Sequence, residues 1–417
     1  MNIFSILGAT VEAPSDLWVT LINWVRGAVG NLGWTLILVT LLVKLVTTPL
    51  DFFVKLNTKK QTLVQQKCAP QVAKLQKKFG HDRQTLQVQT NALYKREGLN
   101  MGAGCIVMLI NLVLTMTIFF TFFSSLRKFS AYEAINQYEQ VSASYEIAYF
   151  AGLDEASDGE FDSQADLNAW QTQMNERKEA FDAMPNSTEG EKAAKQAEAT
   201  AIANEEGRIL DFQKKATEAG KKGAINKWNE NKKNHSWLWI QNIWVQDSTT
   251  SPFPNYASLV SMAKNSGYTD YVKTNINEEN YNRIATLIVD SSTRTANGYY
   301  ILAILAGVIT FAAQYITELH NKLKNKKAQS LAKSAGPENS GSMKVMKIVM
   351  PAVMVIFVLT STASFGLYIL ASNVASIALG ELTTLVVDKM TKKKRLEVEE
   401  YLEKEANRLI KKGHMKG

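Results

Sequence analysis

The chain has 417 residues, of which 46% are hydrophobic and 21% are charged, and its formal net charge is +8. Its two cysteines, Cys68 and Cys105, give no spacing typical of a disulfide framework or a metal site. Charged residues are nearly absent from several stretches of about 20 residues and crowded between them. This segregation predicts a membrane protein with several transmembrane helices and water-soluble segments between them.

Residues 1–32 are expected to form an N-terminal segment with an amphipathic helix that lies on the membrane surface. Ser15 is a candidate N-cap for this helix. Trp18 and Trp24 suit the boundary between membrane and water. An ordinary amphipathic core helix is the alternative interpretation. The apolar side recurs at helical spacing: Leu17, Trp18, Leu21, Ile22, Val25 and Val29.

Five apolar segments each approach the roughly 20 residues that a helix needs to cross the hydrocarbon of a bilayer. The last two are nearly contiguous, which predicts a tight helical hairpin. The predicted spans are residues 33–54, 101–126, 298–317, 345–361 and 363–387.

The charges of the connecting segments predict the orientation. Residues 54–101 carry ten Lys and Arg against two Asp and Glu, residues 318–347 seven against two, and residues 388–417 ten against six. Residues 127–296 carry eighteen against twenty-five. Because short basic loops stay in the cytoplasm, the N-terminus is expected outside and the C-terminus inside. The loop 127–297 is then extracytoplasmic, and the cytoplasmic segments are 55–100, 318–344 and 388–417.

Residues 55–100 are expected to form a cytoplasmic helical hairpin. Two arms with recurring apolar residues flank the turn at residues 79–82, and Asp82 is a candidate cap for the second arm. This segment is too polar to enter lipid.

A second pair of helices is predicted within the extracytoplasmic loop, at about residues 131–235. Two apolar patterns at 3–4 spacing flank a turn near Pro185, and Thr188 with Glu191 matches a capping box. The pattern favours two helices folded back on each other as a coiled-coil-like arm.

The sequence contains no glycine-rich phosphate loop, no zinc-ligand spacing and no nucleophile elbow. We therefore expect neither an enzyme nor a cofactor, and no DNA partner.

Lys44 stands in the middle of the first span, where a cation costs roughly 2.5–3.5 kcal/mol on insertion scales. Such a group usually faces a protein interior or a water-filled cavity. Helical spacing puts three threonines beside it: Thr40, Thr47 and Thr48. Other predicted spans contribute further polar groups: Asn111, Thr115, Thr310, Gln314, Ser372, Asn373 and Ser376.

Two interpretations of these polar groups remain open. In the first, Lys44 snorkels or pairs with Glu381, and the polar residues hold helices together. In the second, the bundle contains a wet, positively charged groove that holds polar or acidic stretches of a translocating chain.

An ordered series of motifs resembles the YidC membrane protein insertase family. The series contains the aromatic amphipathic helix, a Gly-Trp entry into a span with a central cation, and a basic hairpin that ends in LYKREGLN at residues 93–100. Further likenesses are Gly102 to Cys105, Trp237 to Ile240, Met350-Pro351, Gly366-Leu367-Tyr368 and Ser372-Asn373.

The resemblance implies an all-α fold of five membrane helices around a hydrophilic groove, without enzymatic activity or a cofactor. It implies a membrane insertase and chaperone, and it adds Tyr368 to the candidate groove residues. Two departures stand out. The central cation of the family is usually Arg, whereas here it is Lys44, which lacks the bidentate fork of Arg. The insertion at 131–235 has no counterpart in the family pattern.

Two other classes of protein account for parts of the sequence less completely. A small-solute transporter or channel predicts paired intramembrane acids or an inverted repeat, and neither is visible. A membrane-anchored interaction protein that displays the coiled-coil arm accounts for the insertion but leaves the basic hairpin and Lys44 unexplained.

The partners expected for an insertase are nascent membrane proteins and membrane lipid, with the ribosome and the Sec translocon as further candidates. The basic run that follows the fifth span is a candidate contact for ribosomal RNA or for acidic lipid head groups. It comprises Lys392, Lys393, Lys394 and Arg395.

Overall fold

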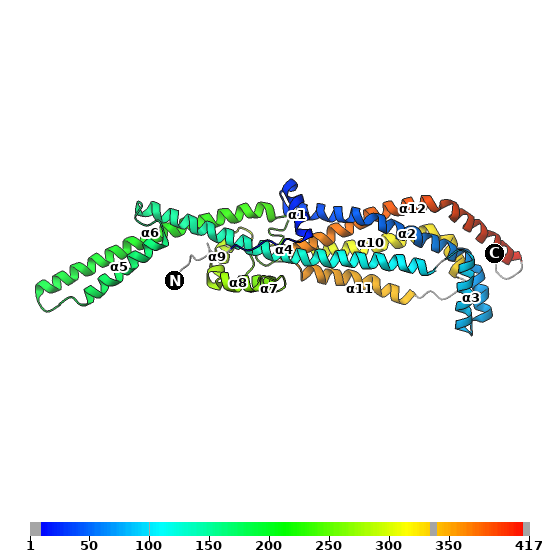
Figure 1. Cartoon of the computed structure of the whole chain (residues 1–417), viewed down its shortest axis with the longest axis horizontal. Helices are drawn as coiled ribbons and strands as arrows, with labels where there is room; N and C mark the ends of the chain where they lie inside the picture. Colours follow the sequence, from blue (N-terminus) through cyan, green and yellow to red (C-terminus); the bar gives the residue numbers. More distant parts are fainter. Residues whose placement is uncertain (1–9, 100, 334–339, 412–417) are drawn as a thin grey trace. The chain divides into compact units, whose positions relative to one another are not determined.

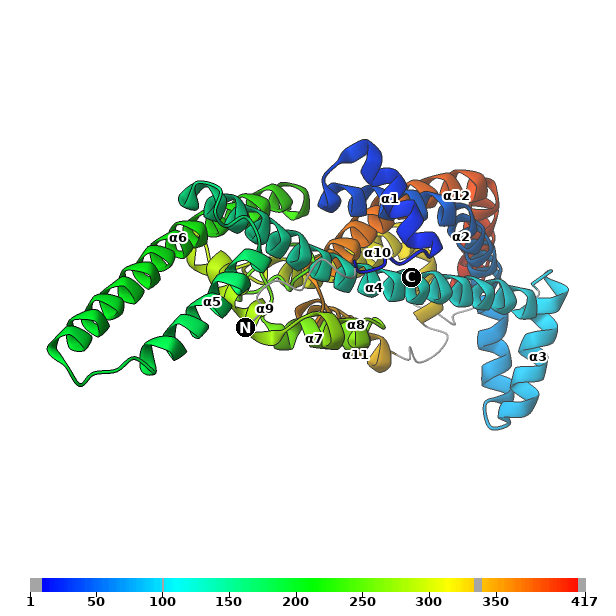
Figure 2. The ribbon, with the colours of Figure 1, turned by 60° about the vertical axis from the view of Figure 1, so that its left-hand side comes forward.

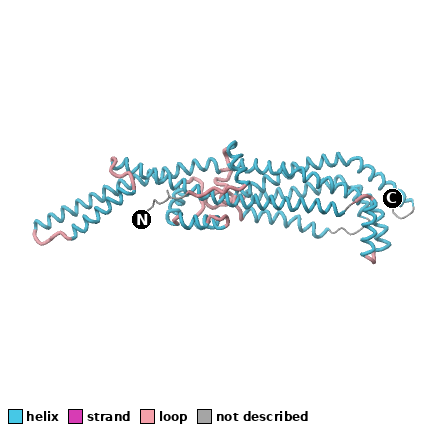
Figure 3. Tube along the Cα trace, in the orientation of Figure 1, coloured by secondary structure: helices cyan, strands magenta, loops and turns pink. Residues whose placement is uncertain are grey.

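The computed structural model describes residues 10–99, 101–333 and 340–411. These residues form helices joined by turns and loops, and within them one isolated bridge, between Trp237 and Ile240, is the only β-type pairing (Figure 3). The predicted all-α architecture is therefore confirmed for the described part of the chain. Portions of the predicted segments lie outside it: residues 1–9, residue 100, residues 334–339 of the predicted cytoplasmic loop 318–344 and residues 412–417 of the predicted tail.

The chain divides into two compact units. The insertion unit comprises residues 1–20, 30–32 and 125–299. The bundle unit comprises residues 21–29, 33–124 and 300–417.

Three helices contribute residues to both units: α1, α4 and α2 (Leu32–Phe79), of which only Leu32 belongs to the insertion unit. α1 (Leu17–Val29) is capped by Asp16, whose carboxylate accepts the N–H groups of Trp18 and Val19, each at 3.1 Å. The cap is thus Asp16 and not Ser15. α4 (Met101–Ser157) is one continuous helix of 57 residues, so it passes through the predicted boundary between the second span and the extracytoplasmic loop.

The bundle unit is built from long helices. α10 packs against both α11 and α12, and glycines permit close approach. A Cβ on Gly307 would lie 2.5 Å from a methyl group of Val355, and one on Gly366 would lie 3.0 Å from a methyl group of Leu302. The helices are α2 (Leu32–Phe79), α3 (Arg83–Arg96), α10 (Ile301–Lys333), α11 (Ser340–Leu359) and α12 (Ala363–Lys411).

Three helices in the described part of the chain are long and apolar enough to cross a membrane: those over Leu32–Phe79, Ile106–Ser157 and Ala363–Glu405. Shorter apolar helices cover Leu17–Val29, Ile301–Ile316 and Ile348–Leu359. The chain is therefore a polytopic α-helical membrane protein. The five predicted spans fall on the three long helices and two of the shorter ones, and their number stays a prediction.

The distal half of α2 and α3 form the helix pair predicted at 55–100 (Figure 2). Asp82 caps α3, because its carboxylate accepts the N–H groups of Gln84 at 3.1 Å and Thr85 at 3.0 Å. A small core of Val64, Cys68, Leu93 and Leu99 holds the two arms together.

The predicted basic tail is a continuation of α12 up to Lys411, and it packs against α2 (Figure 1). Leu63 is buried against Val398 and Leu402. Further along both helices, the ammonium of Lys74 lies 2.8 Å from the carboxylate of Glu405. Residue numbers rise together along this contact, so the two helices run parallel.

The insertion unit contains the predicted pair of helices as α5 (Gln164–Asp182) and the first part of α6 (Glu189–His235) (Figure 1). Both helices begin with a capping box, Ser163 with Asp166 and Thr188 with Glu191. The second of these was predicted from the sequence.

The second part of α6 runs antiparallel to the distal part of α4, and this pairing was not predicted. Glycines lie at the contact: a Cβ on Gly223 would lie 2.5 Å from the Cβ of Ala148, and one on Gly152 would lie 2.6 Å from the Cβ of Ala219. Gly220 lies against the ring of Tyr145. The missing side chains therefore let the two backbones approach each other.

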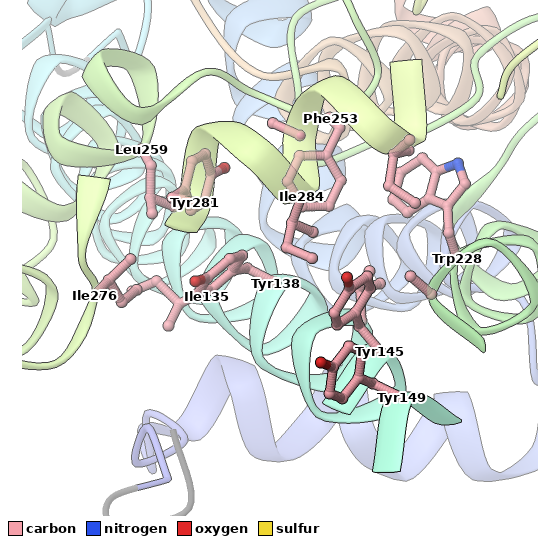
Figure 4. Close-up of a cluster of buried hydrophobic side chains, with 14 of the residues drawn as sticks. Ile135, Tyr138, Tyr145, Tyr149, Trp228, Phe253, Leu259, Ile276, Tyr281 and Ile284 are labelled. Atoms are coloured by element: carbon pink, nitrogen blue, oxygen red, sulfur yellow. The ribbon is translucent and has the colours of Figure 1, made fainter. Parts of the chain in front are cut away.

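The core of the insertion unit combines aliphatic and aromatic side chains (Figure 4). The ring centroids of Tyr138 and Tyr281 lie 4.7 Å apart, and those of Trp228 and Phe253 lie 5.4 Å apart. Three short helices close this core, namely α7 (Tyr256–Lys264), α8 (Thr269–Asn275) and α9 (Glu278–Asp290).

Candidate functional site

The polar stripe predicted on the first span lies on α2, and its hydroxyl groups bond to the helix itself. Thr40 is buried and donates to the carbonyl of Leu36 at 2.7 Å. Thr47 and Thr48 both donate to the carbonyl of Lys44, at 3.1 and 2.7 Å. Lys44 itself is half-buried. The threonine hydroxyls are thus satisfied without any ligand, as is common for Thr in apolar helices.

The predicted polar residues of the other spans do not gather into one cluster. Asn111 is half-buried and Thr115 is exposed on α4, and Gln314 is half-buried on α10. Asn373 of α12 donates to the hydroxyl of Thr310 of α10 at 3.0 Å. This hydrogen bond joins two predicted polar positions from different helices.

Tyr368 lies in an aromatic cluster between α4 and α12. Its ring centroid is 4.7 Å from that of Phe122, 6.3 Å from that of Phe119 and 6.0 Å from that of Phe365. The side chain is buried. Packing between helices accounts for its position.

A cleft of about 520 Å³ lies between α2, α10 and α12. Among the predicted groove residues, Asn373 lines it, whereas Lys44 does not. Both charge signs are present in its lining, which comprises Val54, Lys55, Thr58, Lys59, Thr62, Ala313, Ile316, Asn373, Ser376, Ile377, Gly380, Glu381, Thr384, Val387 and Asp388.

Two lysines of α2 reach α12 inside this cleft. The ammonium of Lys55 donates to the carbonyl of Gly380 at 2.7 Å and to the hydroxyl of Thr383 at 3.0 Å. The ammonium of Lys59 lies 3.0 Å from the carboxylate of Asp388, and the two side chains are 20% and 11% exposed. A charge pair with so little exposure interacts more strongly than one at the surface.

Sequence reasoning missed Lys55, Lys59 and Asp388 of the cleft and named Glu381 only as a candidate partner of Lys44, although the spacing of these residues carried a signal. Lys55 follows Lys44 by eleven residues, which is about three helical turns, so both lie on one face of α2. Glu381 and Asp388 of α12 are seven residues apart, about two turns, and also share a face. The predicted first span ended at residue 54, just before Lys55 and Lys59.

The basic run after the fifth predicted span lies within α12. Lys392, Lys393 and Lys394 are exposed. Arg395 is half-buried, and its Nε lies 3.7 Å from the carboxylate of Glu399. Three adjacent exposed cations on one helix are available to an acidic surface.

The fold and the cleft define a class: a polytopic α-helical membrane protein with a charged cleft between three of its helices. The model of the family described as "60Kd inner membrane protein" matches residues 24–176 and 223–394. The chain belongs to this family. Between its two parts, the match omits residues 177–222. The omitted segment is shorter than the insertion at 131–235 inferred from the sequence motifs.

Curated relatives named "Membrane protein insertase YidC" match parts of the chain. The protein of Aromatoleum aromaticum is 28% identical over 116 residues, which is 28% of this chain and 20% of the relative. That of Jannaschia sp. is 33% identical over 106 residues (25% and 16%), and that of Paracoccus denitrificans is 34% identical over 92 residues (22% and 14%). The chain thus spans a fifth or less of these relatives' lengths. No solved structure matches.

Proposed function

We propose that this protein is a membrane protein insertase, which admits polar parts of a nascent membrane protein into the bilayer and assists its folding. Family membership and the names of the curated relatives support this function. The observation that carries the mechanism is the charged cleft, which lies between helices with long apolar stretches.

The physical task of an insertase is to lower the cost of placing polar groups in hydrocarbon. An unsatisfied backbone polar group costs several kcal/mol there. The cleft offers such groups hydroxyl, amide, ammonium and carboxylate partners, through Thr58, Asn373, Lys59 and Glu381 among others. A segment held there exchanges water for these partners while its apolar part stays in lipid, so no covalent chemistry and no cofactor are needed.

We further propose that Lys44 extends this polar surface along α2. In a straight helix Lys44 lies roughly 16 Å from Lys55 on the same face. The proposed groove therefore contains the cleft and the predicted residues Lys44, Thr40, Thr47, Thr48, Asn111, Thr115, Gln314, Tyr368 and Asn373. A cation along this path favours acidic segments of a substrate.

The test is insertion of a small membrane protein with an acidic translocated segment into liposomes that contain the purified protein. Lys44→Arg is expected to preserve insertion because Arg stays protonated, Lys44→Ala to lose it, and Lys44→Glu to be worse. Normal insertion by Lys44→Ala at normal abundance contradicts the charged groove. If Lys44 only pairs with Glu381, removing both side chains restores what removing Lys44 alone loses.

Two neighbouring lysines of α2 provide a matched pair of variants that tests the cleft. Lys59→Ala removes a cation from the cleft, whereas Lys60→Ala removes an adjacent cation that is exposed and does not line it. We expect the first variant to lower insertion several-fold and the second to leave it unchanged. Equal effects of the two variants contradict a role for the cleft and point to the general basic charge of α2.

The proposed orientation follows from the charge counts, with the N-terminus outside and the C-terminus in the cytoplasm. Protease added to cells stripped of their wall is then expected to cut within 127–297 and to spare 55–100. Cleavage within 55–100 in intact cells overturns the orientation.

The proposed partners are nascent membrane proteins and membrane lipid, with the ribosome and the Sec translocon as candidates. Exposure of Lys392, Lys393 and Lys394 supports a contact with ribosomal RNA or acidic lipid. Such a contact weakens steeply with salt. Equal co-sedimentation of ribosomes with the wild type and with a variant carrying glutamine at these three positions removes the ribosomal proposal.

A further inference from the structure

A tight turn in the insertion unit presents a leucine to the surroundings. Trp237 and Ile240 exchange two backbone hydrogen bonds, of 2.9 and 2.8 Å, so Leu238 and Trp239 form the corner between them. Leu238 has a φ of 47° and its side chain is 67% exposed. A branched apolar residue in the left-handed region is strained, and neither burial nor turn geometry accounts for this leucine.

Aromatic and guanidinium side chains contact the corner. Trp237 is buried, and its ring centroid lies 5.4 Å from that of Trp239. Arg294 donates to the carbonyl of Trp239 and stacks over the ring of Tyr299, 4.7 Å from its centroid. The corner that carries Leu238 is therefore flanked by two indole rings, and a guanidinium donates to its backbone.

Chain continuity connects this turn to the starts of two apolar helices. The amide of Asn31 donates to the carbonyl of Ser236 at 2.8 Å, and α2 begins at the next residue, Leu32. The N–H of Gln241 donates to the carbonyl of Asn297 at 3.1 Å, and α10 begins four residues later at Ile301. The segments that flank the turn are thus bonded to the residues that lead into both helices.

We propose that the turn Trp237–Ile240 is a lipid-binding anchor, in which Leu238 enters the bilayer surface at which α2 and α10 begin. The partner is the membrane surface itself. Trp, Tyr and Arg are the side chains that the interfacial region favours, and a leucine tip inserts among the acyl chains beneath it. The anchor fixes the depth of the insertion unit's loop against the membrane, and it does not depend on the insertase proposal.

A single exposed leucine is ordinary on a soluble surface, so the test compares two leucines. Leu210 of α6 is 65% exposed in the same unit and lies within a regular helix. In a background in which Cys68 and Cys105 are replaced by alanine, Leu238→Cys and Leu210→Cys are each labelled with an environment-sensitive fluorophore. The full-length protein is then reconstituted into liposomes of phosphatidylethanolamine and phosphatidylglycerol.

At position 238 we expect blue-shifted emission, quenching by brominated lipid, and several-fold weaker quenching by iodide than at position 210. Iodide quenching at 238 equal to that at 210 overturns the anchor. Protection from both quenchers also overturns it, because the tip is then covered by protein, such as a second copy of the chain.

A second measurement separates the membrane contact of the Leu238 side chain from its effect on the stability of the insertion unit. Leu238→Gly removes the side chain and relieves the positive φ, so it is expected to keep or raise resistance of the insertion unit to urea. In liposomes the same variant is expected to increase iodide quenching of a fluorophore placed at the neighbouring position by Trp239→Cys. Unchanged quenching at position 239 contradicts the role of Leu238.

Discussion

The close contact between α4 and α6 gives a test in which one kind of substitution has opposite effects at two sites of the same helix. Gly223→Ala places a Cβ 2.5 Å from the Cβ of Ala148 and 2.6 Å from the carbonyl oxygen of Ser144. Neither neighbour is the end of a flexible side chain, so the backbones have to separate. Gly207 is exposed on α6, and nothing lies within 4 Å of an added Cβ there.

The magnitudes decide the sign at each site. Replacing glycine by alanine inside a helix gains up to about 1 kcal/mol from backbone entropy and propensity. Overpacking a tight contact costs about 1–3 kcal/mol, and the rigid neighbours place Gly223 at the upper end. We therefore expect Gly207→Ala to stabilise the insertion unit by up to about 1 kcal/mol and Gly223→Ala to destabilise it by about 2 kcal/mol.

Pulse proteolysis in increasing urea, on the purified protein in detergent micelles, measures this difference. Fragments are assigned by mass, so that unfolding of the insertion unit is followed separately from that of the bundle unit. The two variants are expected to differ by about 3 kcal/mol, a factor of more than about 100 in the fraction unfolded. Stabilisation by Gly223→Ala as large as that by Gly207→Ala refutes the close packing of α4 on α6.

Two further predictions concern pH and the parallel helices. The Arg208 guanidinium holds the pKa of the Glu160 and Glu205 carboxyls below their ordinary value of 4.5, so their stabilisation is present above that value and is lost as the pH falls through the lowered pKa. Arg208→Gln is expected to destabilise the insertion unit at pH 7 by about 1 kcal/mol or less, because the pairs are largely exposed. In urea titrations, the difference in unfolding free energy between wild type and variant is expected to vanish near pH 2. A difference that stays constant with pH contradicts the ionic origin. Cysteines at positions 71 and 401, where the amide of Gln71 donates to the hydroxyl of Tyr401 at 3.3 Å, are expected to cross-link within one chain under mild oxidation; the same yield from cysteines at 71 and 394 contradicts the parallel register.

Local signals in the sequence predicted the helix ends most successfully. Asp82 and the pair Thr188 and Glu191 act within three or four residues of themselves, so the pattern alone identifies them. The cap of α1 was wrong by one residue, because Ser15 and Asp16 both suit an N-cap. Here the carboxylate of Asp16 takes the N–H groups.

The extent of the long helices could not be read from hydropathy. α4 continues to Ser157 although its apolar stretch ends near residue 126, because its distal face packs on α6 and α9. The spacing of Ile135, Tyr138, Tyr145 and Tyr149 carries that helical period. Average hydropathy over this stretch does not indicate a membrane span, because polar residues separate these apolar ones.

The cleft was missed for a related reason. In its own segment, each lysine and carboxylate of the cleft is already explained as part of a basic loop or as the end of a span. Only the packing of α2 beside α12 shows that Lys55 and Lys59 face Gly380 and Asp388. The sequence thus predicted a cation in the membrane at Lys44, and three-dimensional pairing was needed to find the others.

The charges of the cleft also bear on how a substrate would be held. Lys59 is paired with Asp388, and Lys55 is bonded to a carbonyl and hydroxyl groups, so neither cation is freely available to an entering acidic segment. A substrate carboxylate has to displace a partner, and the exchange of one ion pair for another changes the free energy little. Under the proposed insertase function, binding that is nearly balanced in this way suits release of the substrate to the lipid, because a groove that offered bare cations would retain acidic segments.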